Sequence, residues 1–164
     1  MGVLENIVLS LGSNLGDRRA FLEKARLMIA SDIGEIMRSS SLYENASWGF
    51  VSGDFLNQVI EIASTDTPQL LLQKIQAIEK KLGRTTKSHS DSNTGKITYS
   101  DRTIDIDILL YRNESLNGEE LTIPHPRIAQ REFVLCLLTE LFQDEVISPF
   151  TSSFKQLLQH TLKS

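Results

Sequence analysis

Two aspartates, Asp105 and Asp107, stand two residues apart in the apolar segment 102–111. If this segment is a β-strand, the two side chains share one face and lie roughly 6.5–7 Å apart. Like charges at that separation repel by about 2 kcal/mol, and aspartate is a poor strand former. A cation would remove the repulsion, and carboxylates without a His or Cys partner favour Mg²⁺ over zinc. A solvated acidic face on an edge strand would give the same pattern, so both interpretations stay open.

Cationic side chains flank this pair in the sequence. Arg102 precedes Asp105 by three residues. Arg84 ends a predicted helix, and Arg131 follows a Pro-His-Pro segment. Carboxylates and arginines around one site fit a metal-bound polyphosphate, because the metal bridges phosphate oxygens and the guanidinium groups neutralise the remaining charge. In the Pro-His-Pro segment, His125 could donate to a phosphate or make a structural hydrogen bond, and its restricted backbone suits either role.

Glycine-rich phosphate-binding motifs do not occur in the sequence. There is no G-x-x-x-x-G-K-[ST] loop and no G-x-G-x-x-G fingerprint. Residues 12–16, which contain two glycines, indicate only a turn between a strand and a helix. Nucleotide binding would therefore depend on side chains.

Hydrophobic patterning predicts the elements that must position these residues. Strands are predicted at 6–11, 35–43, 55–63 and 102–111, and helices at 18–30, 68–82, 131–142 and 154–162. The helix at 68–82 has clear signals at both ends, since Thr67 can cap it, Pro68 suits its first turn and Gly83 can end it.

The order of these elements predicts an α+β fold of the ferredoxin-like βαββαβ kind, an antiparallel sheet with helices on one face, plus C-terminal additions. The last strand should place residues 104, 106, 108 and 110 on one face, and 103, 105, 107, 109 and 111 on the other. The face that carries the aspartates would be the face without helices. A loop at 44–54 contains Trp48, and the polar stretch 85–100 is interpreted as a functional lid, with a tolerated surface insertion as the alternative.

Composition narrows the class of protein. The 164 residues favour one domain, 1–164, and the net charge of −4 excludes a generally basic nucleic-acid binder. A single cysteine, Cys136, cannot form an internal disulfide, which predicts an intracellular, cytoplasmic protein. Its apolar surroundings, 133–138, predict a buried and inert thiol. No apolar run approaches the length of a membrane-spanning helix.

The chain resembles the 6-hydroxymethyl-7,8-dihydropterin pyrophosphokinases of folate biosynthesis over nearly its whole length. The stretches that carry the resemblance are 11–17 (LGSNLGD), 40–44 (SSLYE), 54–57 (DFLN), 78–79 with 83–84, 101–109 (DRTIDIDIL), 121–127 (LTIPHPR) and 131–135 (REFVL). The Asp-x-Asp strand and the Pro-His-Pro segment, in this order and spacing, are its most specific part.

The resemblance implies one reaction and a set of residues for it. ATP gives its β,γ-pyrophosphoryl group to the pterin hydroxymethyl oxygen, AMP leaves, and two Mg²⁺ ions bind Asp105 and Asp107. Catalytic roles fall on Arg84 and Arg102 together with the two aspartates. The pterin positions implied are Asn45, Ala46, Trp48, Phe55, Asn57 and Phe133. The ATP positions implied are Gln76, Glu79, Arg84, Tyr99, Arg102, Ile108, Thr122, His125 and Arg131.

Two other functions compete with this interpretation. A ferredoxin-like nucleic-acid-binding module would need a basic sheet face with stacking aromatic residues, whereas the predicted open face carries two carboxylates. A Mg²⁺-dependent phosphohydrolase would use the same carboxylates. We expect ATP and the pterin as the only partners, with no nucleic acid and no membrane, and a monomeric chain.

Overall fold

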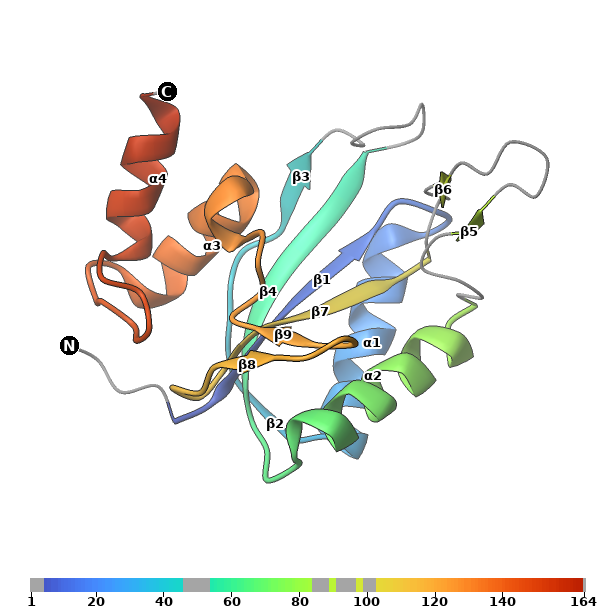
Figure 1. Ribbon diagram of the computed structural model, residues 1–164. Coiled ribbons are helices and arrows are strands. Elements are labelled where there is room, and N and C mark those ends of the chain that lie inside the picture. The colour runs from blue at the N-terminus through green and yellow to red at the C-terminus, as the bar shows by residue number, and fades with distance from the viewer. Residues whose placement is uncertain (1–4, 46–53, 84–88, 91–96, 99–102, 164) are drawn as a thin grey trace.

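The computed structural model describes residues 5–45, 54–83, 89–90, 97–98 and 103–163 (Figure 1). Its main sheet has the strand order β2-β4-β1-β7, with β3 also paired to β4. The strands are β1 (Ile7–Ser13), β2 (Glu35–Ser39), β3 (Tyr43–Asn45), β4 (Phe55–Ala63) and β7 (Asp105–Tyr111). Every pair in this sheet is antiparallel. The inner strands are β4 and β1, and β7 lies at one end of the order.

Two helices cover one face of this sheet, α1 (Arg18–Asp32) and α2 (Pro68–Lys81) (Figure 1). Asp17 caps α1 by accepting a hydrogen bond from the Ala20 N–H, and Thr67 caps α2 in the same way at Leu70. Gly83 follows α2 with a φ of +101°, the left-handed conformation that ends helices. With the sheet order, these helices confirm the predicted ferredoxin-like arrangement.

The predicted strand 35–43 is divided in the structure. β2 ends at Ser39 and β3 begins at Tyr43, while both pair with β4. At the break, the Ser40 hydroxyl accepts a hydrogen bond from the Val59 N–H at 2.9 Å, and the Ser40 carbonyl accepts one from the Gln58 side chain at 2.9 Å. Side chains therefore replace part of the backbone ladder between β2 and β3.

A β-bulge changes the alternation of β7. Val8 pairs with Leu110 and Leu9 with Ile108, so Leu109 is an extra residue in β7. Leu109 and Leu110 both join the core away from α1 and α2, whereas Tyr111 joins the core beneath those helices. The predicted faces of residues 110 and 111 were therefore wrong. Before the bulge the alternation holds, and Asp105 and Asp107 share one face.

The second face of the sheet is not open along its whole length, contrary to the sequence-based expectation. Two C-terminal helices, α3 (Glu132–Phe142) and α4 (Phe154–Leu162), form a second core against it. Val8, Val59 and Leu109 are the sheet residues of this core. Figure 1 shows α3 and α4 on the opposite side of the sheet from α1 and α2. The layer covers the part of this face nearest the bulge and reaches β3 through Phe133 and Tyr43, while the aspartates remain partly exposed.

Short elements complete the described chain. A hairpin of β8 (Leu116–Asn117) and β9 (Thr122–Ile123) leads to a 3₁₀ turn, η1 (Ile128–Gln130). In the region predicted as a lid, β5 (His89–Ser90) pairs with β6 (Ile97–Thr98), and the rest of 84–102 lies outside the described residues. Across the described part of the chain, no helix combines the length and hydrophobicity that crossing a bilayer requires.

A charged contact fastens α3 to the sheet. The Arg38 guanidinium lies 2.7 Å from the buried Glu61 carboxylate and donates to the Leu141 carbonyl at 2.6 Å. It also lies over the Phe142 ring, 5.0 Å from the ring centroid. Because Glu61 is largely desolvated, its pairing with Arg38 offsets the cost of burying the charge. The contact joins the last turn of α3 to β2 and β4.

The deepest anchor of the C-terminal layer is Phe154, which is 1% exposed and packs against the rings of Phe142 and Phe150. We predict that Phe154→Ala lowers the free energy of unfolding by about 3–5 kcal/mol because it opens a cavity between α3 and α4. Leu162→Ala is the matched control in the same helix, since Leu162 is 59% exposed, and it should cost less than about 0.5 kcal/mol. Denaturant titration measures both, and equal losses would contradict this packing.

Candidate active site

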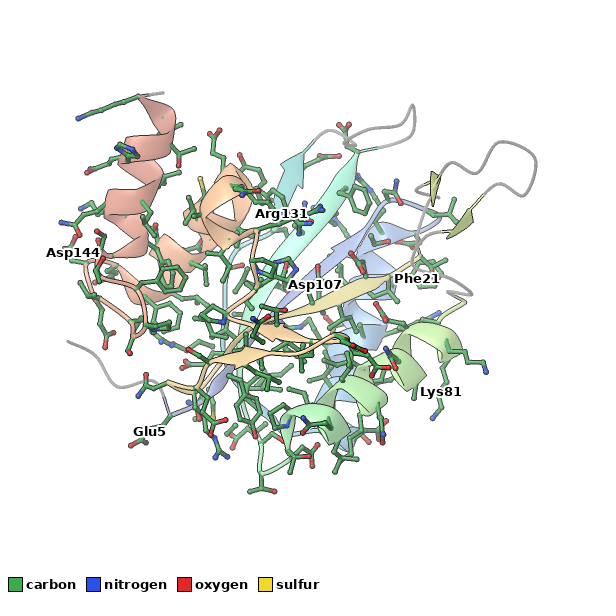
Figure 2. All side chains as sticks on the ribbon, in the orientation of Figure 1. Glu5, Phe21, Lys81, Asp107, Arg131 and Asp144 are labelled. Atoms are coloured by element: carbon green, nitrogen blue, oxygen red, sulfur yellow. The ribbon has the colours of Figure 1, made fainter. Side chains whose placement is uncertain are left out.

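The two aspartates lie on the face of β7 that points toward the α3 side of the sheet. Both are partly buried, and the Asp107 side chain keeps 14% of its surface exposed. Arg131, at the start of α3, brings a guanidinium nitrogen within 3.7 Å of an Asp107 carboxylate oxygen (Figure 2). Three sequence-predicted residues from two distant segments thus meet at one place.

Gly12 stands in the middle of this surface. It pairs with Asn57 on β4 and with Asp105 on β7, so the three residues form one row across neighbouring strands. Strands lie about 4.8 Å apart, which puts Asn57 and Asp105 roughly 10 Å from each other with only a glycine between them. A Cβ at Gly12 would come within 2.9 Å of the Asn57 Oδ1 and 3.5 Å of the Phe55 ring. The missing side chain therefore leaves room for the Asn57 amide.

Asn57 is held in one orientation. It is 4% exposed, and its Nδ2 donates to the Tyr43 carbonyl at 3.2 Å. The Tyr43 ring in turn lies 6.3 Å, centroid to centroid, from the ring of Phe133 on α3. Phe55 is two residues from Asn57 on β4. The structure therefore gathers three of the predicted pterin residues, Phe55, Asn57 and Phe133, around the strand pair β3–β4.

The outer edge of β7 is contacted by two segments other than strands of the main sheet. The buried Glu79 of α2 accepts a hydrogen bond from the Ile106 N–H at 2.9 Å. Beyond the aspartates, the His125 N–H donates to the Leu109 carbonyl at 2.9 Å. The His125 Nδ1 accepts from the Arg127 N–H at 3.2 Å, so a neutral imidazole carries its proton on Nε2. His125 can then donate from Nε2 to an anion beside β7.

The other predicted nucleotide residues lie in different surroundings. Gln76 is exposed on α2, and Thr122 is half-buried on β9, which contacts β7. The Ile108 side chain is 4% exposed and belongs to the core beneath α1 and α2. Any contact of Ile108 with a nucleotide would therefore involve its backbone.

Several predicted residues lie outside the described part of the chain. These are Ala46, Trp48, Arg84, Tyr99 and Arg102. For Asn45 the structure describes the strand pairing with Phe55 and nothing of the side chain. The roles of all the predicted site residues stay predictions, and for these six the structure describes no side chain.

The carboxylate ligands of the site suit Mg²⁺ better than a metal ion that is coordinated entirely by protein side chains. Among the described residues no group of three or more His, Cys, Asp or Glu side chains could hold a metal ion. Mg²⁺ characteristically takes one or two carboxylates and completes its shell with water and substrate phosphates. Asp105 and Asp107 are two carboxylates on one strand face, with the Arg131 cation beside Asp107, and this donor set fits such an ion.

Sequence reasoning missed the importance of Gly12, Ser10 and Tyr43. Gly12 was assigned to a turn, whereas β1 continues through it to Ser13. A glycine inside a strand often marks a close backbone approach, and this signal was available. Ser10, 8% exposed, pairs with Asp107, and Tyr43 holds Asn57; both positions depend on strand register.

Cys136 is half-buried on α3 rather than fully buried as expected. Desolvation raises the pKa of its thiol above the usual range, and the negative charge of Glu132 raises that pKa further. Both effects disfavour the thiolate and agree with the interpretation of an unreactive cysteine. A surface hollow of about 410 Å³ lies beside α1, away from the predicted site residues; it is lined by Arg19, Leu22, Glu23, Arg26, Leu42 and Gln58.

Residues 8–143 match the family described as 7,8-dihydro-6-hydroxymethylpterin-pyrophosphokinase (HPPK). A 2-amino-4-hydroxy-6-hydroxymethyldihydropteridine pyrophosphokinase of Porphyromonas gingivalis is 43% identical over 137 residues, which cover 82% of this chain and 89% of that protein. The protein of the same name from Aquifex aeolicus is 37% identical over 147 residues, covering 89% of this chain and 85% of that protein.

Solved structures show the same fold. A Plasmodium falciparum HPPK-DHPS structure aligns with 98% of this chain at a TM-score of 0.73 and 15% identity. An HPPK-DHPS in complex with substrates aligns over 98% at a TM-score of 0.72 and 14% identity. This chain spans 45% and 44% of those two chains, so the likeness concerns one part of each.

Proposed function

The chain belongs to the 7,8-dihydro-6-hydroxymethylpterin-pyrophosphokinase family, and from this premise we propose how its residues perform the reaction. It is a folate-biosynthesis enzyme that transfers pyrophosphate from ATP to the hydroxymethyl group of 6-hydroxymethyl-7,8-dihydropterin and releases AMP. The assignment of residues rests on the row Asn57–Gly12–Asp105, which crosses three neighbouring strands. We assign the Asn57 end of this row to the pterin and the Asp105 end to the triphosphate.

The acidic end is proposed to bind the triphosphate. Asp105 and Asp107 would hold magnesium, two ions in our proposal, and the bound metal supplies charge neutralisation at the reacting phosphates. Arg131 is placed to contact a phosphate from the α3 side, because its guanidinium already lies 3.7 Å from Asp107. His125 would donate from Nε2, and Arg84 and Arg102 would add the positive charge that a polyphosphate transition state requires.

The remaining nucleotide contacts are proposed along the outer edge of β7. The Ile106 N–H points away from β1, toward Glu79, so the backbone of Ile108, two residues on, also points outward. Ile108 would offer these backbone groups to the adenine. Gln76, Tyr99 and Thr122 complete the proposed nucleotide contacts, and the buried Glu79 borders this side through its hydrogen bond to the Ile106 N–H.

The other end of the row is proposed to bind the pterin. Phe55 and Phe133 would contact the two faces of the flat ring, an arrangement that suits a planar heterocycle. Because the Asn57 Nδ2 donates to the Tyr43 carbonyl, the Oδ1 is oriented over Gly12 and would accept from the pyrimidine edge of the pterin. Asn45, Ala46 and Trp48 would contribute mainly backbone contacts.

The reaction needs no covalent intermediate with the protein. The hydroxymethyl oxygen attacks the β-phosphorus of ATP in line, and the bond from this phosphorus to the oxygen that bridges to the α-phosphate breaks. AMP leaves with that oxygen, and the hydroxyl proton is released. The protein accelerates this step by holding the two substrates at opposite ends of one row and by fixing charge around the phosphates.

The two competing functions are not favoured by the family membership. A nucleic-acid-binding module would not require the paired carboxylates, and a phosphohydrolase would not require Asn57 with its aromatic neighbours. The monomeric state, the cytoplasmic location and the division into one domain stay predictions.

The function itself is tested by product analysis. With ATP, Mg²⁺ and 6-hydroxymethyl-7,8-dihydropterin together, we expect one AMP for each pyrophosphorylated pterin, measured by chromatography. Without the pterin, AMP should not accumulate. Release of inorganic phosphate that is independent of the pterin would instead identify a hydrolase.

Removal of either carboxylate charge should stop turnover while leaving the fold intact. We predict that Asp105→Asn or Asp107→Asn lowers kcat by about a thousandfold or more, because the magnesium ligands are lost at the reacting phosphates. Thermal unfolding should show a folded protein, and pterin binding by calorimetry should change little. Wild-type turnover in either variant would overturn the metal assignment.

A methyl group at Gly12 should weaken pterin binding. We predict that Gly12→Ala raises the Kd for the pterin about tenfold, because the new Cβ would displace the Asn57 amide, while the affinity for ATP with Mg²⁺ stays within about twofold. The double variant Gly12→Ala/Asn57→Ala is the control. If the effect passes through Asn57, the second substitution adds little to the first; fully additive losses would contradict this explanation.

A further inference from the structure

At both edges of the β7 segment that carries the aspartates, the backbone has hydrogen-bonding partners. β1 pairs with one edge of β7. At the other edge, Glu79 accepts from the Ile106 N–H, and His125 donates to the Leu109 carbonyl. Asp107 lies between these two contacts. The outer edge near the site is therefore tied to the end of α2 and to the segment after β9.

Glu79 is an unusual residue for its surroundings. It lies in the last turn of α2, is 7% exposed and has the buried neighbour Ile78 beside it in the sequence. Burying a carboxylate is costly unless strong hydrogen bonds satisfy it. Its Oε2 lies 2.9 Å from the Ile106 nitrogen, the distance of a good charge-assisted hydrogen bond. The buried carboxylate thus accepts a hydrogen bond from a backbone N–H of β7.

That N–H belongs to the residue between the two aspartates. The relative placement of Asp105 and Asp107 depends on the backbone torsions around Ile106, and the regular alternation is lost three residues later, at the bulge of Leu109. Two carboxylates that repel each other would otherwise favour a twist that separates them. A fixed contact at Ile106 opposes that twist.

We infer that Glu79 is a positioning residue for the magnesium–nucleotide site: it holds Ile106 so that Asp105 and Asp107 stay on one face at a constant spacing. This inference rests on the proposed function, because it takes the two aspartates as the metal-binding pair. It differs from a direct contact of the Glu79 carboxylate with the nucleotide, in which the charge itself would matter.

Two substitutions distinguish the effect of the length of the Glu79 side chain from the effect of its charge. Glu79→Gln keeps the length and an acceptor oxygen but removes the charge. Glu79→Asp keeps the charge but shortens the side chain by one methylene, so that it no longer reaches the Ile106 nitrogen. A positioning role requires the Gln variant to behave like the wild type and the Asp variant to fail. A direct charge contact predicts failure of the Gln variant.

The measurements are calorimetric binding of a non-hydrolysable ATP analogue with Mg²⁺, calorimetric binding of the pterin, and hydrogen exchange of the Ile106 amide by NMR in the ligand-free protein. For Glu79→Asp we expect Ile106 exchange at least about tenfold faster, an analogue Kd about tenfold higher and a pterin Kd within about twofold of the wild type. For Glu79→Gln all three should stay within about threefold.

Ser40→Ala is the matched control, because it also removes a buried side-chain acceptor from a strand N–H, at Val59 on β4. It should lower the melting temperature without changing analogue binding. Loss of binding in Glu79→Gln with unchanged Ile106 exchange would overturn the inference, and so would a Glu79→Asp variant that exchanges faster yet binds normally. If the Asp variant does not fold, Glu79→Met, which keeps the length but has no acceptor oxygen, takes its place and should give the results expected of Glu79→Asp.

Failure of the proposed function would be recognised separately. Asp107→Asn, measured in the same way, should lose the Mg²⁺-dependent part of analogue binding. If it does not, the metal-binding pair is wrong whatever Glu79 does. If it does, and Glu79→Gln behaves like Glu79→Asp, only the positioning role is wrong.

Discussion

Repulsion between two carboxylates on one strand face is the constraint around which this end of the molecule is arranged. Three contacts surround Asp105 and Asp107 on β7. Arg131 places a cation beside Asp107, Glu79 holds the backbone between the two residues, and β1 pairs with the opposite edge. Under the proposed function, the negative charge of the pair is what a divalent cation carried by a polyphosphate would bind.

The C-terminal helices turn one half of a sheet face into core and leave the other half as a site. Val8, Val59 and Leu109 pack under α3 and α4, while Gly12 and the aspartates lie beyond the edge of this layer. The start of α3 also supplies Arg131 and Phe133, so the layer of α3 and α4 lines one side of the candidate site and also stabilises the fold. Arg38 and Glu61 tie the far end of the same helix to the sheet, which limits how far that side of the site can move.

Local signals were sufficient for most of the elements. The caps at Asp17 and Thr67 and the left-handed Gly83 act within a few residues, so their helices could be predicted from sequence. The same holds for β4, whose predicted range of 55–63 matches the structure. The division between β2 and β3 could not be predicted, since it depends on hydrogen bonds between Ser40 and a strand 19 residues away in sequence.

The residue types determined the chemistry of this protein, and the tertiary structure decided its geometry. Asp105, Asp107 and the arginines favour a metal-bound polyphosphate, because charge and ligand preference belong to the side chain. That Gly12 separates Asn57 from Asp105, and that the face is half covered, follows from strand register and helix packing. Strand register and helix packing join segments that are dozens of residues apart in the sequence. A hydrophobic pattern of period two or 3.6 carries no information on such pairings.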